Sequence, residues 1–453
     1  MRRWQPVGLV GLMLVALPWQ AWSQSIAPGS GDSRLAPVEG PLTLTPATAA
    51  RLAVARSTET ARAGQDVAAA EGRLMEARSL RGWKVTASGS ISKSGPAVSF
   101  ELPGGEDGQR VTVSPTTTTN VGLEVSKPLY LGARDRYARD AARSGLQAAS
   151  FGTEATSVAV ALRARQAVLA VLRAQQLSVV AQEQLTAAAE HLRIAEAMYN
   201  EGTAARFEVI QAQTEVSRSR GAVVQARTAV EQQTATLREV LNLPQDTPVT
   251  VEEGVGPEMP PGDVHELMAL AMSERPDLKA LQAAVRAAEA SLRLAAANDR
   301  LSVQLVGQAN HQTAGALSSS DNWRASVAVV KPLYQGGATE AGVVQARAGL
   351  EKAKLDLEKA QQQVALQLTQ AMNAVEEARE MLQVATDGER EAEERLRIAQ
   401  VRFTSGVGLG VEVIDSQAAL AAARAAIVNA RNDLNLAIFA VRAALGRTDL
   451  PEE

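Results

Sequence analysis

The sequence Lys-Pro-Leu-Tyr at Lys127–Tyr130 occurs again at Lys331–Tyr334, and the chain that follows it is repeated as well. Residues 127–242 match residues 331–446 at a constant shift of 204 positions, without an insertion. This period differs from that of solenoid proteins, whose repeats span about 20–50 residues. The chain therefore holds two copies of one half-molecule, and each half tests what is predicted for the other.

The composition favours closely packed long helices and argues against a large globular core. Hydrophobic residues make up 46% of the 453 residues but aromatic residues only 3%, whereas a large core usually carries more aromatic side chains. Much of the apolar content is alanine, which has the highest helix propensity. Length alone suggests two or three domains, but the duplication indicates one pseudo-twofold body. The lack of cysteine excludes disulfides, thiolate metal sites and a lipid anchor on an N-terminal cysteine.

Residues 1–23 have the pattern of a secretory signal peptide. Arg2 and Arg3 precede an apolar stretch, and Ala21-Trp22-Ser23 offers a cleavage site between small residues. The alternative is a membrane anchor, but the apolar stretch of Val7–Leu17 is too short to cross a bilayer. No later segment is apolar enough for a spanning helix. Residues 24–44 are expected to form a flexible leader, because they are rich in Gly, Ser and Pro.

Residues 45–242 are predicted to form the first structural repeat. Thr45 caps a helix that continues to about Arg81. The hydrophobic period then changes from 3.6 to 2, which predicts a β-hairpin at about 84–127. A proline-free stretch from Arg134 to Asn200 predicts a helix about 100 Å long. A turn at about 200–206 and a return helix complete the repeat.

Residues 263–446 are predicted to form the second repeat, after a proline-rich linker at 243–262. It begins with a capping box at Asp263. A β-hairpin follows at about 301–331, then a long helix, a turn at about 404–410 and a return helix. Apolar residues recur every seven positions in the long helix, which is typical of a coiled coil. A short tail follows at 447–453.

Each chain thus offers two long helical hairpins and four strands with one apolar face. Four strands cannot close a barrel, and an open sheet edge is not tolerated in lipid. Two chains would give eight strands and a filled interior, whereas three would give twelve and a water-filled lumen. If the strands enter a membrane, the chain is therefore a trimer. Aromatic residues placed at the strand ends would form an interfacial belt, although ordinary packing is an alternative for each: Trp83, Tyr130, Trp323 and Tyr334.

The duplicated plan resembles the TolC-type outer-membrane efflux protein family. The resemblance rests on the Lys-Pro-Leu-Tyr junctions and on two matching segments, Tyr199–Gln213 and Phe403–Gln417. It implies a mainly α protein, with long helical hairpins forming a coiled-coil α-barrel and four strands per chain contributing to a trimeric 12-stranded β-barrel. It also implies a passive exit duct in the cell outer membrane that extends into the periplasm. The partners would be a periplasmic adaptor (a membrane fusion protein) and an inner-membrane pump of the RND or ABC type, for efflux or for type I secretion.

The resemblance further implies an acidic constriction at the periplasmic turns. By register its residues are Glu412 and Asp415 in the second repeat and Glu208 in the first. Three chains would bring nine carboxylates to one opening, which would favour cations and, by mutual repulsion, an open state. The alternative is that these acids complement helix dipoles. Some family members have a basic residue in the second turn, where this chain has Gly408, and the nearest arginines are Arg206 and Arg402.

The two turns resemble the tips that meet the adaptor. Their residues are Gly202, Thr203 and Ala204 in the first repeat, and Gly406, Val407, Gly408 and Leu409 in the second. Glycine there also has a simpler role as a helix C-cap. The junctions between barrel and helices are expected at Pro128, Tyr130, Pro332 and Tyr334.

The sequence favours neither an enzyme nor a nucleic-acid-binding protein. His191, His265 and His311 are widely spaced and are expected to be solvated or structural, no cofactor motif is found, and basic residues alternate with acids. A second hypothesis is a soluble periplasmic coiled-coil scaffold or adaptor. It explains the helices and the signal peptide but not the four strands with an apolar face.

Overall fold

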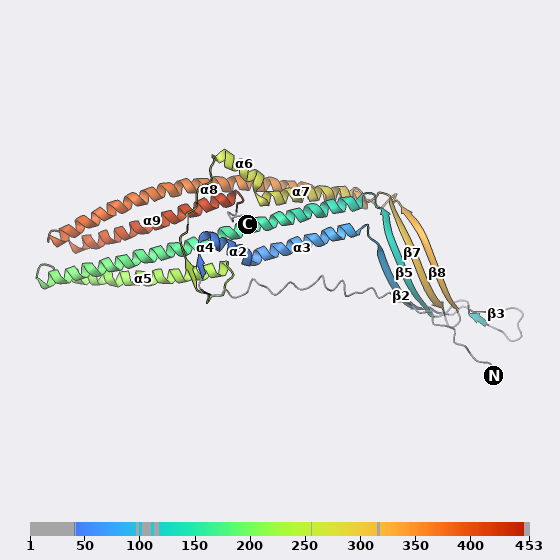
Figure 1. The fold of residues 1–453 in the computed structure, drawn as a ribbon, viewed down its shortest axis with the longest axis horizontal. Coiled ribbons are helices and arrows are strands. Elements are labelled where there is room, and N and C mark those ends of the chain that lie inside the picture. Colours follow the sequence, from blue (N-terminus) through green and yellow to red (C-terminus); the bar gives the residue numbers. More distant parts are fainter. Residues whose placement is uncertain are drawn as a thin grey trace, which may run out of the picture.

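The computed structural model describes residues 40, 42–96, 99–101, 110–112, 117–254, 256–314 and 318–447. The predicted signal peptide and most of the predicted leader and tail lie outside these residues. The described part is elongated: long helices run side by side, and a four-stranded sheet extends from one end of them (Figure 1). The first half contains β1 (Leu42–Leu44), α2 (Pro46–Arg56), α3 (Thr58–Ser79), β2 (Lys84–Lys93), β3 (Ser99–Glu101), β4 (Arg110–Thr112), β5 (Thr117–Tyr130), α4 (Arg134–Asn200) and α5 (Arg206–Val240).

The second half repeats the main elements in the same order. After β6 (Val249–Val251) come α6 (Val264–Glu274), α7 (Pro276–Ala295), β7 (Ser302–Ala314), β8 (Ser318–Val330), α8 (Ala338–Thr404) and α9 (Gly410–Ala444). Helices α4 and α8 have 67 residues each, and α5 and α9 have 35 each. The duplication seen in the sequence is therefore a duplication of structure, with equal lengths for the two long helical hairpins.

The single helix predicted from Thr45 to about Arg81 is wrong, because the chain breaks at Ser57. Thr45 caps α2 as predicted, and Ser57 ends α2 and caps α3 with an extended backbone. The Ser57 hydroxyl accepts a hydrogen bond from the backbone N–H of Glu59 at 3.1 Å. A serine side chain that satisfies a free N–H competes with the continuous helix. The break allows α2 to bury Ala49 and Ala53 in the core around α4.

The four long strands form one antiparallel sheet in the order β2-β5-β7-β8. Gly89 lies opposite Val121 in the first hairpin, and Gly307 lies opposite Ala325 in the second. The two hairpins thus have the same register, with β7 matching β2 at a shift of 218 positions and β8 matching β5 at a shift of 204. Strand β5 continues through the first Lys-Pro-Leu-Tyr segment, whereas β8 ends at Val330, just before the second.

One face of this sheet carries exposed apolar side chains and the other carries polar ones. Ile91, Leu123 and Val327 are exposed on the apolar face. On the opposite face, Gln308 donates a hydrogen bond to Glu124 at 2.8 Å. An exposed apolar surface of this kind marks contact with lipid or with another protein.

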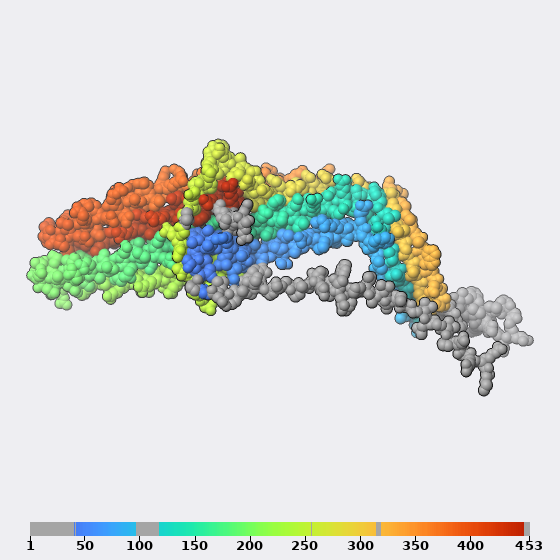
Figure 2. Space-filling view, in the orientation of Figure 1, coloured from blue at the N-terminus to red at the C-terminus, as the bar shows by residue number. Residues whose placement is uncertain are grey.

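The helices form two antiparallel hairpins that lie along each other. Helix α4 packs on α5 and α8 packs on α9, and α9 also packs on α4. Figure 1 shows the resulting order α8, α9, α4, α5, so that α8 and α5 lie at the two edges. The space-filling view shows contact between the hairpins along their length (Figure 2). Helices α3 and α7 continue the assembly toward the sheet by packing on α4, and α7 also packs on α8.

Two hydrophobic clusters hold the middle of the molecule together. One joins α2, α4, α5, α9 and the short strands around Val168, Leu237 and Phe439. The other joins α6, α7, α8 and α9 around Leu368 and Val441. Among the described helices, α4 is the one apolar and long enough to cross a membrane by composition, with a mean hydropathy of 1.4 over its best window. Buried residues from Val160 to Leu172 place this part of α4 in the core instead.

Candidate functional site

The candidate site lies at the ends of the two helical hairpins, far from the sheet. The chain turns between α4 and α5 and again between α8 and α9, and both turns have the same backbone hydrogen bonds. The N–H groups of Thr203 and Ala204 donate to the carbonyl of Met198, and those of Val407 and Gly408 donate to the carbonyl of Arg402.

Both turns need a glycine at the same position. Gly202 has a φ of 78° and Gly406 a φ of 73°, values in the left-handed region that an L side chain rarely adopts. The simple C-cap role therefore accounts for these two glycines. The capping role does not explain the exposed apolar side chains next to these glycines, which are Phe207, Val407 and Leu409.

The predicted acids lie at the start of the return helices. Glu208 is in the first turn of α5 and Glu412 in the first turn of α9, so both also complement a helix dipole. Asp415 is exposed one turn further along α9, on the same hairpin as Glu412. Glu208 belongs to the other hairpin. Within one chain, therefore, the structure brings two of the three acids together.

Arg402 supplies a positive charge that the sequence analysis left without a partner. Its Nε atom lies 3.8 Å from Oε2 of Glu412, across the turn between α8 and α9. Both side chains are about half exposed, so the pair contributes at most about 1 kcal/mol. Among the described residues, neither Asp415 nor Glu208 has an ion pair.

A small core lies directly behind the second turn. It contains Phe403 and Val413, and the ring of His191 from α4 lies 5.1 Å from the Phe403 ring. Gly410 of α9 faces this pair: a Cβ atom there would lie 3.4 Å from Cε2 of Phe403 and 3.5 Å from Nε2 of His191, which are ordinary van der Waals distances. His191 is structural rather than solvated, and its burial lowers its pKa.

Gln417 ties the same region of α9 to the first hairpin. Its side-chain amide is buried and donates a hydrogen bond to the backbone carbonyl of Ala187 in α4 at 3.2 Å. The sequence analysis identified Gln417 as part of a repeated segment but assigned no contact to it. Gln213, at the matching position of the first repeat, is exposed. The burial of Gln417 therefore comes from tertiary packing and not from the local sequence.

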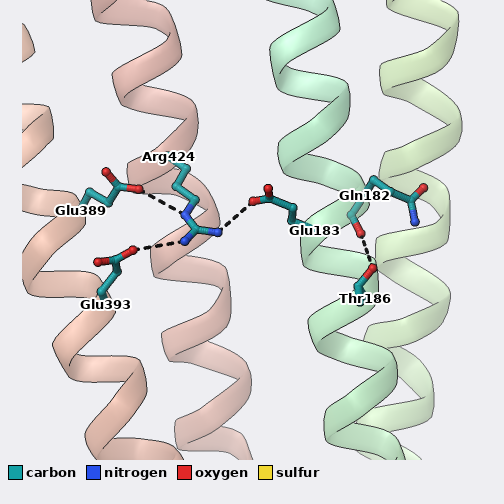
Figure 3. A network of polar contacts seen from close by, with 6 residues as sticks. All are labelled: Gln182, Glu183, Thr186, Glu389, Glu393 and Arg424. Atoms are coloured by element: carbon teal, nitrogen blue, oxygen red, sulfur yellow. Dashed lines mark hydrogen bonds and ion pairs between the residues drawn. The ribbon is translucent and has the colours of Figure 1, made fainter.

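Arg424 joins three helices through three carboxylates (Figure 3). It lies 2.8 Å from Glu183 of α4 and 3.2 Å from each of Glu389 and Glu393 of α8. Burial lowers the pKa of Arg424, but the hydrogen bonds that Arg424 donates to Glu393 and Glu389 and the charges of Glu183 and Glu389 outweigh burial and raise this pKa. Below this cluster in α4, the Thr186 hydroxyl donates to the carbonyl of Gln182 at 2.9 Å.

This network was not predicted, because basic residues that alternate with acids indicate a solvated helix face. The comparison of repeats contains the signal. Arg424 matches Arg220, but Glu389 and Glu393 match Leu185 and Ala189. A pair of acids present in one repeat and replaced by apolar residues in the other points to a local function in the second repeat.

The aromatic residues assigned to strand ends do not all lie there. Tyr130 is the last residue of β5, and Trp83 precedes β2, with the Lys127 ammonium 4.8 Å above its ring. Tyr334 follows β8 at the same end of the sheet. Trp323 instead lies inside β8 opposite Ala309, because β8 begins as early as Ser318. The placement of Trp323 at a strand end is therefore wrong, although its side chain is exposed on the apolar face.

Comparisons with known proteins agree with this architecture. The sequence pattern of the family described as outer membrane efflux protein matches residues 49–243 and 267–447. The outer membrane efflux protein BepC of Brucella suis is 25% identical over 336 residues, which are 73% of this chain and 73% of that protein.

Solved structures show the same fold. The outer membrane protein VceC of Vibrio cholerae has a TM-score of 0.73 and 18% identity, covering 88% of this chain and 95% of that one. The CmeC outer membrane channel of Campylobacter jejuni has a TM-score of 0.75 and 18% identity, covering 89% and 86%. The open-state MtrE outer membrane channel of Neisseria gonorrhoeae has a TM-score of 0.69 and 21% identity, covering 90% and 91%.

These findings decide between the two hypotheses left open by the sequence. A soluble scaffold would leave the exposed apolar face of the sheet without a role, whereas a channel places it against lipid. The family match covers both repeats. The chain belongs to the outer membrane efflux protein family, and it is a passive exit duct for efflux pumps in the outer membrane, with an extension into the periplasm.

Proposed function

We propose that three copies of the chain close into one duct, with a 12-stranded β-barrel in the membrane and a helical cylinder below it. The observation that carries this proposal is the open sheet: among the described strands, β2 and β8 each have a neighbour on one side only. An open edge in lipid leaves backbone groups without hydrogen bonds, and each such group costs several kcal/mol. Three sheets of four strands are the smallest set that closes around a water-filled lumen.

The same closure would gather the acids of the hairpin tips around one opening. Glu412, Asp415 and Glu208 from each copy then form the narrowest charged part of the duct. Like charges at close range raise the free energy of a closed opening, and a ring of carboxylates favours cations. Arg402, 3.8 Å from Glu412, offsets part of this repulsion.

The exposed turns are the surface proposed for a periplasmic adaptor. Phe207, Val407 and Leu409 are apolar and exposed at the tips, next to the glycine turns. An adaptor with a helical hairpin would bury them, because apolar anchors at a helix tip fit grooves between helices. An inner-membrane pump of the RND or ABC type would then supply the energy, since the duct itself is passive.

Conductance across a planar lipid bilayer tests this proposal. The purified full-length protein should insert and give uniform conductance steps with a preference for cations. Protein that is recovered from the outer-membrane fraction but gives no conductance at any voltage would refute the closed duct.

A further inference from the structure

The two edges of the molecule are copies of surfaces that are already in contact inside it. Within the chain, β5 pairs with β7 and α9 packs on α4. The internal symmetry matches β5 with β8, β7 with β2, α9 with α5 and α4 with α8. Applied to these contacts, it pairs β8 of one copy with β2 of the next, and it packs α8 of one copy on α5 of the next.

The repeated Lys-Pro-Leu-Tyr sequence provides the first evidence. In the first repeat it belongs to β5, where Pro128 lies opposite Gln304 of β7. In the second repeat the same four residues follow the end of β8, and none of the described strands lies beside them. The exposed fraction rises from 45% for Leu129 to 90% for Leu333, and from 51% for Tyr130 to 88% for Tyr334. Since the sequences are identical, the difference comes from the missing neighbour.

The β5–β7 ladder inside the chain also fixes the register of the proposed ladder between β8 of one copy and β2 of the next. Val125 lies opposite Gly307 where β5 meets β7. The shifts of 204 and 218 positions turn this pair into Val329 opposite Gly89 of the next copy. Both residues lie on the apolar face, as the alternation of a sheet requires. A slip by one residue would turn one strand's polar side chains toward the lipid.

The hairpin tips provide the second, independent evidence. Phe403 is 3% exposed because His191 of α4 covers it, whereas its counterpart Tyr199 is 44% exposed. Gln417 is buried against α4, whereas its counterpart Gln213 is exposed. Buried positions of the second repeat are thus open in the first, on the side where α8 of another copy would lie.

Charge complementarity points to the same neighbour. Arg424 of α9 binds Glu183 of α4 at 2.8 Å. The matching residues are Arg220 of α5, which is exposed, and Asp387 of α8. Asp387 is oriented on its own helix by Arg390 at 3.3 Å and Gln383 at 3.0 Å. The first repeat has apolar residues where the second has Glu389 and Glu393. The proposed contact between copies therefore has fewer ion pairs than the contact between α9 and α4 within the chain.

We infer that the partner of both edges is a second copy of this chain, in a defined register. Val329 lies opposite Gly89 of the neighbouring copy, and Asp387 binds Arg220 of that copy. Gln213 of the neighbouring copy donates to the backbone of Glu391, as Gln417 does to Ala187 within the chain. This inference rests on the proposed closure by three copies and adds the residues at which the copies meet.

Cysteine cross-linking tests the register, because the chain has no cysteine of its own. The test variant combines Gln213→Cys with Glu391→Cys and is treated in membranes with a short bis-maleimide. It should give bands of two and three linked chains on a denaturing gel. The matched control combines Gln417→Cys with Ala187→Cys, which should link within one chain and leave the monomer band.

A register control separates specific from random contact. Gln213→Cys with Val384→Cys moves one thiol by two turns along the same face of α8, about 10 Å, and should give little linked product. The mass of untreated particles is measured in parallel. Particles of three copies whose Gln213/Glu391 pair fails to link, while the internal control links, would overturn the register and leave the closure standing. Particles of a single copy would overturn both.

Discussion

The two helical hairpins have equal lengths and similar sequences but different surroundings. The second hairpin, α8 and α9, buries Phe403, Gln417 and Ser416 against the first or within its own tip. The first hairpin, α4 and α5, leaves the counterparts Tyr199 and Gln213 exposed. Duplication alone therefore does not make the surroundings of the two halves equal. One interface formed within the chain and could specialise, while the other has to form between identical copies.

The largest difference in stability between the hairpin tips is expected when Phe403 and its counterpart Tyr199 are each replaced. Phe403→Ala should lower the free energy of unfolding of the tip by about 3 kcal/mol, because it empties a buried site. Tyr199→Ala should cost less, because the Tyr199 side chain is 44% exposed within one chain and the position that matches His191 is Arg395, which has no ring to cover it. Protease cleavage near the turns, compared for the two variants, measures this. Equal cleavage rates would contradict the asymmetry.

The next comparison concerns the charges of the two turns. Glu412→Gln with Asp415→Asn removes two thirds of the proposed carboxylates, and Glu208→Gln removes one third. The ratio of cation to anion permeability in planar bilayers should fall strongly for the double variant and slightly for Glu208→Gln. An unchanged ratio in the double variant would place these acids outside the constriction.

Arg424 and Arg220 sharpen the comparison of ion pairs. Arg424→Ala leaves three carboxylates of α4 and α8 without their shared cation, and we expect a loss of about 1 kcal/mol for this partly exposed network. Arg220→Ala should have a smaller effect, because Arg220 is proposed to bind one carboxylate, Asp387 of the neighbouring copy, instead of three. Thermal unfolding in detergent at low and high salt measures both. A larger loss for Arg220→Ala would reverse the ranking of the two contacts.

The smallest expected effect is a pH dependence that only the second tip has. Burial lowers the pKa of His191 below its ordinary value of about 6.5. The unfolded chain therefore binds the proton more readily, so the contribution of His191 is complete above about pH 6.5 and is lost as the pH falls through the lowered pKa.

The loss of protection at the tip on acidification, followed by hydrogen exchange, should be smaller in His191→Gln. His265→Gln is the control, because His265 is exposed on α6. If the control and His191→Gln respond alike, the buried imidazole is not the group that titrates.

The long helices and their turns could be predicted from the sequence because their signals are local. Proline is absent from each long helix, and Gly202 and Gly406 mark left-handed turns. The two β-hairpins could be predicted because the alternation of residues is copied between the halves, whereas their registers come from the structure. The break at Ser57 was missed because the wider segments on both sides are rich in alanine and arginine, which favour a helix, and one hydroxyl decides the outcome.

The side-chain network of the site could not be predicted in the same way. A helical pattern places Glu389 and Glu393 on one face of α8, but a solvated face and a contact between hairpins have the same pattern. The position of Trp323 was missed because the extent of β8 depends on pairing with β7 and not on its own residues. His191 required knowledge of its neighbours on α8 and α9.

In the proposed assembly, one chain forms one third of a closed duct. Native mass spectrometry of the intact protein, released from detergent micelles, counts the copies directly. We expect a single species with the mass of three chains. A species of one or two chains, with the sheet still folded, would contradict the account.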